Sequence, residues 1–112
     1  MKKYMLVFTL IIFPITSFSQ TTLSGYRNIK LIGCHKGDNT CYVTIDGEKV
    51  GPTACQSDSL RWNTEKDANG KEIFSLLNAA FFSGKKVSFA VSDSCYLYQD
   101  AFPTFNYINI SN

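Results

Sequence analysis

The sequence predicts a mainly β domain with one helix, arranged as an OB-fold-like, five-stranded Greek-key barrel. Three observations predict it: three short strand patterns, then a single amphipathic helix pattern, then two further strand patterns. Short strands in a small chain leave exposed edges unless the sheet closes, and a helix between the third and fourth strands can cover one open end of such a barrel. An open α+β sheet with one covering helix fits the same order of elements almost as well.

Residues 1–19 have the pattern of a secretory signal peptide. Two lysines precede an apolar run of about 12 residues, which is shorter than the roughly 20 that a membrane-spanning helix needs. Small serine side chains occupy the positions that cleavage before Gln20 requires. Removing 19 of the 112 residues leaves one domain of 93, residues 20–112. We expect this domain to be secreted or periplasmic, without membrane insertion.

The expected domain carries no net charge. The whole chain has 11 Lys and Arg against 9 Asp and Glu, and two of the lysines lie in the signal peptide. No basic stripe remains to neutralise a phosphate backbone or an anionic lipid surface. Nucleic acid and lipid are therefore not expected as the main partner.

The first expected strand covers residues 25–33, after a loose polar lead-in at residues 20–24. The segment that follows, residues 34–40, is rich in turn-forming glycine, asparagine and aspartate. A loop is therefore expected between the first strand and the next.

The second expected strand covers residues 41–45, where apolar and polar side chains alternate. Asp46 and Gly47 follow it and are typical of a two-residue hairpin turn. A return strand over residues 48–51 and a third short strand over residues 53–56 are therefore expected.

One helix is expected over residues 70–83. Asn69 is its predicted N-cap, with Glu72 completing a capping box, and Gly84 is placed to end it in the left-handed conformation. The apolar side chains that recur at helical spacing and predict its buried face are Ile73, Leu77, Ala80 and Phe81.

The segments around the helix are a polar connection and two strands. Residues 57–69 are predicted to be a polar connection. This segment contains Trp62, which we expect to anchor a core or an interface. After the helix, residues 87–92 alternate as a half-buried strand, residues 93–94 form a turn, and residues 104–110 form the last strand.

The four cysteines all lie in the expected domain and predict two disulfides, because an even count in a short exported chain is typical of disulfide cross-linking. A zinc site is disfavoured, since no Cys-x-x-Cys pair is present and His35 is the single histidine. We favour the pairs Cys34–Cys41 and Cys55–Cys95. The alternative pairs Cys41 with Cys55 and Cys34 with Cys95.

Nothing in the sequence indicates catalysis. His35 lies in a turn next to a cysteine, and the carboxylates are scattered among turns. Phosphate-binding, metalloprotease and nucleophile-elbow motifs are missing from the sequence. We therefore expect no enzyme activity, no cofactor and no metal.

The aromatic content favours a binding function. The expected domain has six Phe, five Tyr and one Trp. Tyr96 and Tyr98 flank Leu97, so an extended segment would place both hydroxyl groups on one side, next to Gln99 and Asp100. Such a strip can stack on a sugar and hydrogen-bond to it, or it can seal a subunit interface.

Several short motifs resemble the B subunits of subtilase-cytotoxin-like and typhoid-toxin-like AB5 toxins, and related small exported bacterial OB-fold proteins. They lie within residues 35–89 and include a His-x-Gly at His35, the strand at residues 41–45, and an Ala-Cys ending at Cys55. The others are Trp62 and the segment 76–89, which runs from the helix into a Val-rich strand.

The resemblance implies an OB-fold, a homopentamer with a catalytic A subunit as partner, and binding of cell-surface glycans, often sialylated. It suggests Tyr26 as the aromatic residue near the sugar, with Arg27 or Asn28 standing where the family has a sugar-contacting serine. We therefore expect an exported glycan-binding domain without catalysis. The alternative is a small monomeric exported module that binds a protein partner in a structural or inhibitory role.

Overall fold

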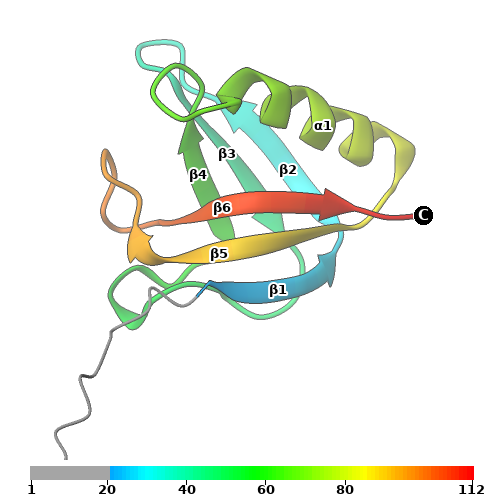
Figure 1. Cartoon of the computed structure of the whole chain (residues 1–112), viewed down its shortest axis with the longest axis horizontal. Helices are drawn as coiled ribbons and strands as arrows, with labels where there is room; N and C mark the ends of the chain where they lie inside the picture. The colour runs from blue at the N-terminus through cyan, green and yellow to red at the C-terminus, as the bar shows by residue number, and fades with distance from the viewer. Residues whose placement is uncertain (1–20) are drawn as a thin grey trace, which may run out of the picture.

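The computed structural model describes residues 21–112, and within this range the chain is mainly β with one α-helix (Figure 1). The predicted signal peptide, residues 1–19, lies outside the described residues. The elements in chain order are β1 (Thr22–Arg27), β2 (Ile29–Cys34), β3 (Thr40–Ile45), the short 3-10 helix η1 (Thr53–Cys55), β4 (Ser59–Asn63), α1 (Gly70–Ser83), β5 (Val87–Cys95) and β6 (Pro103–Ile110).

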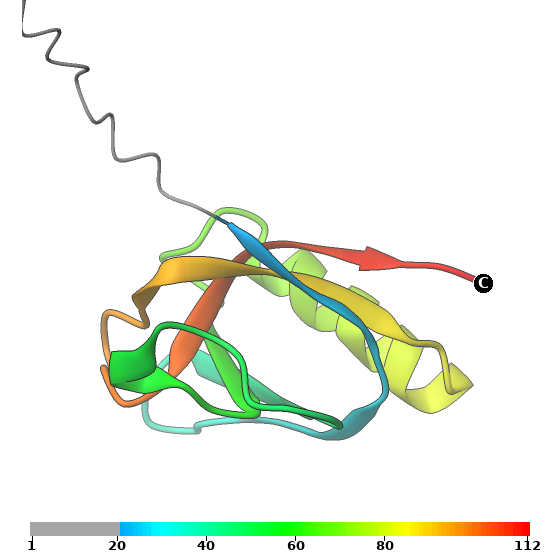
Figure 2. The ribbon, with the colours of Figure 1, turned by 90° about the horizontal axis from the view of Figure 1, so that it is seen from below.

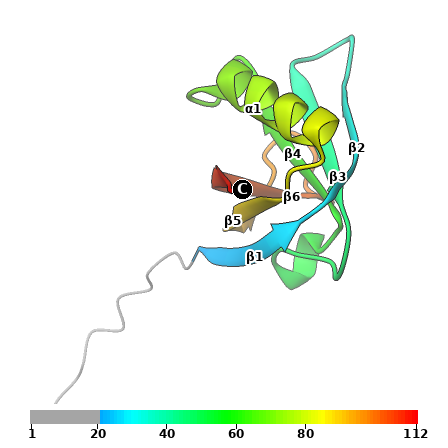
Figure 3. The ribbon, with the colours of Figure 1, turned by 90° about the vertical axis from the view of Figure 1, so that its right-hand side faces the viewer.

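The strands form two three-stranded antiparallel sheets, one in the order β1-β5-β6 and the other in the order β2-β3-β4. β1 and β2 are separated only by Asn28, so the chain passes directly from one sheet into the other, as Figure 3 shows. The single strand predicted over residues 25–33 is therefore two strands in different sheets. A bulge between Leu23 and Tyr26, with Gly25 at a φ of 73°, bends this segment.

Two further differences concern the ends of the predicted strands. Thr22 and Leu23, in the segment expected to be a loose lead-in, pair with Val91 and Ala90 of β5. β5 continues through the turn that was predicted at residues 93–94. At residues 22–23 the neighbouring strand supplies the pairing, and cross-strand partners are not visible in local sequence. At residues 93–94 the ladder with β6 is irregular, because its register shifts between Val91 and Cys95.

The predicted hairpin after β3 is wrong. Gly47 has the expected positive φ of 83°, but residues 48–51 do not pair with β3, and residues 53–56 contain η1 instead of a strand. The guanidinium of Arg27 donates hydrogen bonds to the carbonyl oxygens of Asp46 at 2.6 Å and Glu48 at 3.1 Å. These contacts hold the chain against β1 and lead it away from β3.

β3 pairs with β2 on one side and with β4 on the other, and β4 lies inside the segment predicted to be a polar connection. Leu60 and Trp62 alternate with polar residues, and both are buried in the core. Figure 2 shows the segment between β3 and β4, with η1, beside the loop that follows β5. The polar neighbours of Leu60 and Trp62 concealed an alternating strand pattern.

The helix has the predicted range, and Gly84 ends it in the left-handed conformation as predicted, with φ of 71°. Asn69 is the N-cap residue as predicted, but the predicted side-chain cap is wrong: Asn69 is left-handed, at a φ of 59°, and its side chain makes no capping hydrogen bond. The reason is the tight approach of the helix to β4, since a Cβ atom on Gly70 would lie 2.6 Å from the Asn63 carbonyl oxygen. Asn69 turns the chain into that contact.

The core lies between the two sheets and α1. Trp62 and Phe89 both pack edge-on against Phe105, with ring centroids 5.6 and 5.3 Å apart, and α1 contributes Leu77 and Ala80. The other core side chains come mainly from β3, β4 and β5 and include Val43, Ile45, Leu60, Val87 and Val91.

The two favoured disulfides, Cys34–Cys41 and Cys55–Cys95, are both present. The first joins directly opposite residues of β2 and β3, and the second ties η1 to the end of β5. Two disulfides in so small a domain indicate an extracellular or periplasmic location. In the described part of the chain, no helix has the length and apolar character needed to cross a membrane.

Candidate functional site

The outward face of β2, β3 and β4 carries a row of three directly opposite residues, Gly33, Tyr42 and Arg61. The inward neighbours of Tyr42 and Arg61 are core residues, so the alternation of the strands places this row on the opposite face. Gly33 makes room for the tyrosine, because a Cβ atom on it would lie 2.7 Å from the Tyr42 hydroxyl oxygen. The phenol ring therefore lies over β2 and next to Arg61.

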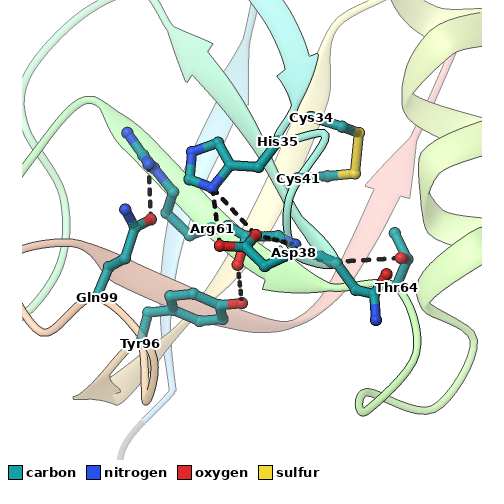
Figure 4. Close-up of polar contacts among 10 residues, drawn as sticks. Cys34, His35, Asp38, Cys41, Arg61, Thr64, Tyr96 and Gln99 are labelled. Carbon is teal, nitrogen blue, oxygen red and sulfur yellow. Dashed lines mark hydrogen bonds and ion pairs between the residues drawn. A yellow bond between two sulfur atoms is a disulfide. The ribbon is translucent and has the colours of Figure 1, made fainter.

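Arg61 is held by two aromatic rings and two hydrogen bonds. Its guanidinium carbon lies 3.6 Å from the ring centroid of Phe102 and 4.8 Å from that of Tyr42. Nη1 donates to Oε1 of Gln99 at 2.7 Å (Figure 4), and Nε donates to the hydroxyl of Ser59 at 3.3 Å. The other guanidinium N–H groups have no acceptor among residues 21–112. A cation in a fixed orientation thus keeps donors free for a ligand.

The electrostatic state of Arg61 suits the binding of an anion. Partial burial lowers the pKa of its guanidinium, which nevertheless stays protonated at neutral pH. No acidic side chain is paired with it in the part of the chain that the structure describes. Its contacts within these residues are with neutral groups: the two ring faces, the amide oxygen of Gln99 and the hydroxyl of Ser59.

The loop before β3, residues 35–39, borders the site on one side. His35 lies 5.7 Å from the Tyr42 ring and its Nδ1 is 3.1 Å from Oδ1 of Asp38, as Figure 4 shows. The same carboxylate accepts a hydrogen bond from the main-chain N–H of Thr40 at 2.9 Å. The bond from Thr40, more than His35, lowers the pKa of Asp38. The ionised carboxylate therefore shapes this loop.

Acid is expected to destabilise the fold through Asp38 and Asp46. Hydrogen bonds from the side chain and main chain of Asn28 lower the pKa of Asp46, as those from Thr40 and His35 do for Asp38. Because each folded pKa lies below the ordinary 3.8, the stabilisation is complete above that value and is lost as pH falls through the folded pKa. Melting temperatures should therefore fall as the pH is lowered below about 4. The Asp38→Asn/Asp46→Asn variant should fall less, and an equal fall would contradict this.

The loop after β5, residues 96–102, borders the site on the other side. Tyr98 is 53% exposed, and its ring packs edge-on against Tyr96 with centroids 5.6 Å apart. Tyr96 is buried, and its hydroxyl lies 2.7 Å from the hydroxyl of Thr40. The predicted strip is therefore half wrong: the segment is a turn, and of its two hydroxyl groups the Tyr96 hydroxyl is used internally while the Tyr98 ring is exposed.

The sugar contacts suggested by the resemblance lie elsewhere, on and after β1. The Asn28 main-chain N–H and Nδ2 donate to the two carboxylate oxygens of Asp46 at 2.9 and 3.0 Å, while Arg27 holds the turn that contains this residue. Tyr26 is half-exposed beside Lys85 and Lys86. The structure thus gives Arg27 and Asn28 internal hydrogen-bond partners and leaves the Tyr26 ring open to solvent. A glycan contact at these three residues stays a prediction.

The sequence pointed to the tyrosines and to Gln99 beside them but missed Arg61 and Phe102 as parts of a site. The alternation of residues 59–63 was a signal for Arg61, since it places this residue opposite to Leu60 and Trp62. Phe102 had no such signal. Among residues 21–112, no group of three His, Cys, Asp or Glu side chains could hold a metal ion.

Comparisons with known proteins do not extend this description. No protein-family model, no curated protein and no solved structure matches the chain.

Proposed function

We propose that this chain is an exported, non-enzymatic glycan-binding domain built on an OB-type barrel. In this interpretation β1 and β2 together form one bent strand. The strand pairs β1–β5, β2–β3, β3–β4 and β5–β6 are then the pairs expected of a five-stranded Greek-key barrel. Thr104 of β6 donates a hydrogen bond to the Arg61 carbonyl oxygen of β4 at 2.7 Å, at the place where the barrel would close. α1 then lies between the third and fourth strands of the barrel.

The barrel topology favours the face of β3 and β4 as the ligand site. OB-folds bind oligosaccharides and oligonucleotides on their second and third strands, between the loop joining strands one and two and the loop joining strands four and five. Residues 35–39 and 96–102 are the corresponding loops here. Arg61 lies on β4, where Phe102 and Gln99 of the loop 96–102 contact it. His35 of the loop 35–39 packs against Tyr42, the residue directly opposite Arg61.

The chemistry of this face favours a sugar that carries a carboxylate. The observation that carries the proposal is the guanidinium of Arg61, stacked 3.6 Å over Phe102 and hydrogen-bonded to Gln99, with N–H groups left for an incoming acceptor. Guanidinium groups bind carboxylates through paired hydrogen bonds. Tyr98 supplies an exposed ring for the apolar face of a sugar. Sialylated glycans, implied by the resemblance, meet both requirements.

Replacing Arg61 by alanine should weaken binding to sialylated oligosaccharides by roughly 10- to 100-fold, because a charge-assisted contact is lost. Arg61→Lys keeps the charge but loses the planar, stacked donor group, so an intermediate affinity is expected. The measurement is a glycan array of sialylated and neutral oligosaccharides, followed by titration calorimetry on the glycans that bind. Lys66→Ala, which removes one exposed positive charge from the turn before α1, is the matched control and should bind as the wild type does.

Two results would contradict this assignment. If Tyr26→Ala abolishes binding and Arg61→Ala does not, the sugar site lies at β1, as the resemblance suggests, and the β3–β4 face is wrong. If the wild type binds no glycan, carbohydrate recognition is wrong. The alternative, a protein partner, is favoured by one observation, the 81% exposure of Leu97 at the tip of the same loop.

The resemblance also leads us to propose a homopentamer that carries a catalytic A subunit. Supporting features are the small size, the export signal in the sequence and the two disulfides. The solution mass from light scattering separates a ring from a monomer. A gene for an ADP-ribosyltransferase or a protease beside this one would support the toxin assignment, and a monomeric mass would contradict it.

A further inference from the structure

The hydrogen bond between Thr40 and Tyr96 differs from every other side-chain pair in residues 21–112. Their hydroxyl oxygens lie 2.7 Å apart, and it is the one side chain–side chain hydrogen bond in this range whose partners are both buried, at 1% and 3% exposure. Burying two hydroxyl groups is unfavourable unless they satisfy each other, so this geometry is strongly specified.

Thr40 is the residue through which the first loop is shaped. Its main-chain N–H donates to Oδ1 of Asp38 at 2.9 Å, and its carbonyl oxygen accepts from the N–H of His35 at 2.9 Å. Both ends of the segment 35–39 therefore depend on the position of this one residue.

Tyr96 has the corresponding role in the second loop, residues 96–102. Its main-chain N–H donates to the carbonyl oxygen of Phe102 at 2.8 Å. The main-chain N–H of Phe102 in turn donates to the carbonyl oxygen of Gln99 at 3.1 Å. Its ring packs edge-on against Tyr98. Tyr96 therefore orients three side chains: those of Gln99 and Phe102, which contact Arg61, and that of Tyr98, which is exposed beside them.

We propose that Thr40 and Tyr96 are a positioning pair, whose buried hydrogen bond locks the two loops together and thereby fixes Gln99, Phe102 and Tyr98 around Arg61. This inference rests on the proposed function for its effect on affinity, but the locking of the loop is a property of the protein alone. Neither residue reaches the ligand, because both are buried. Their role is to keep the site preorganised, which lowers the entropic cost of binding.

The test uses Tyr96→Phe, Thr40→Val and the double variant in the full domain, with sialyllactose as the probe. Each single variant leaves one buried hydroxyl unpaired and should weaken binding about three- to tenfold. The double variant removes both polar groups, so it should bind no worse than either single variant. Thr40→Ser keeps the hydroxyl and should restore wild-type affinity. Tyr107→Phe, which removes a hydroxyl from a half-exposed tyrosine on β6, is the matched control.

Amide hydrogen exchange measured by mass spectrometry supplies a readout that needs no ligand. Peptides covering residues 96–102 should exchange faster in Tyr96→Phe, while those covering α1 should be unchanged. If exchange in these residues is unchanged, or if it increases equally throughout the domain, the positioning role is wrong. Wild-type affinity in both single variants would also overturn it. If the wild type does not bind sialyllactose while exchange in residues 96–102 is accelerated, the locking stands and the proposed ligand is wrong.

Discussion

Replacing Trp62 by alanine is expected to lower the free energy of unfolding by about 3 to 5 kcal/mol. The side chain is 1% exposed, packs against Phe105, and donates a hydrogen bond from Nε1 to the Gly70 carbonyl oxygen at 2.9 Å. The substitution would leave a cavity at the junction of β4, β6 and α1 and would remove the side-chain hydrogen bond that ties β4 to the first carbonyl group of the helix. A domain of this size has a total stability of about 5 to 15 kcal/mol, so the loss is a large part of it.

Urea unfolding followed by far-ultraviolet circular dichroism measures this loss, since the variant lacks the chain's single tryptophan as a fluorescent probe. Trp62→Phe retains most of the packing but not the hydrogen bond, so a smaller loss is expected. Leu76→Ala, at a half-exposed position of α1, should change stability by no more than about 0.5 kcal/mol. A Trp62→Ala variant as stable as Leu76→Ala would show that the contacts around Trp62 do not anchor the helix.

Removing the disulfide Cys55–Cys95 should be the second large effect, at about 4 kcal/mol in the chain-entropy model, because it closes a loop with a sequence separation of 40. Cys34–Cys41 has a separation of only 7, so its removal should cost about 2.5 kcal/mol. The comparison uses the double variants Cys55→Ala/Cys95→Ala and Cys34→Ala/Cys41→Ala, each with the other disulfide intact. Unfolding midpoints in denaturant, without reductant, give the order.

Loss of the Cys55–Cys95 disulfide should also affect ligand binding. Cys95 immediately precedes Tyr96, so the disulfide holds the beginning of the loop that borders Arg61. We therefore expect the Cys55→Ala/Cys95→Ala variant to lose ligand affinity as well as stability. If removal of Cys34–Cys41 proves the more destabilising, the loop-closure argument is wrong for this domain, and native contacts around that disulfide must dominate.

The part of the candidate site that the sequence indicated is the part with a local signal. Tyr42 lies in a strand with clear alternation, and the tyrosines at 96 and 98 stood out by their spacing. Arg61 did not stand out in this way, because the nearby Ser59 and Asn63 are typical of a loop. Its partner Gln99 is 38 residues away, a relation that no local pattern encodes. The roles of Arg27 and Asn28 were equally hidden, since both depend on a turn 18 or 19 residues further along.

The sequence by itself determined α1, its end at Gly84, and the strand cores of β3, β5 and β6. It favoured, but did not determine, the cysteine pairing that the structure contains. Periodic burial and backbone preferences within a few residues are enough for those elements. Only the tertiary structure decided that β4 pairs with β3, that the first strand divides between two sheets, and that Arg61 meets Phe102 and Gln99. These features depend on hydrogen bonds and packing between segments far apart in the chain, which form only when the whole core is assembled.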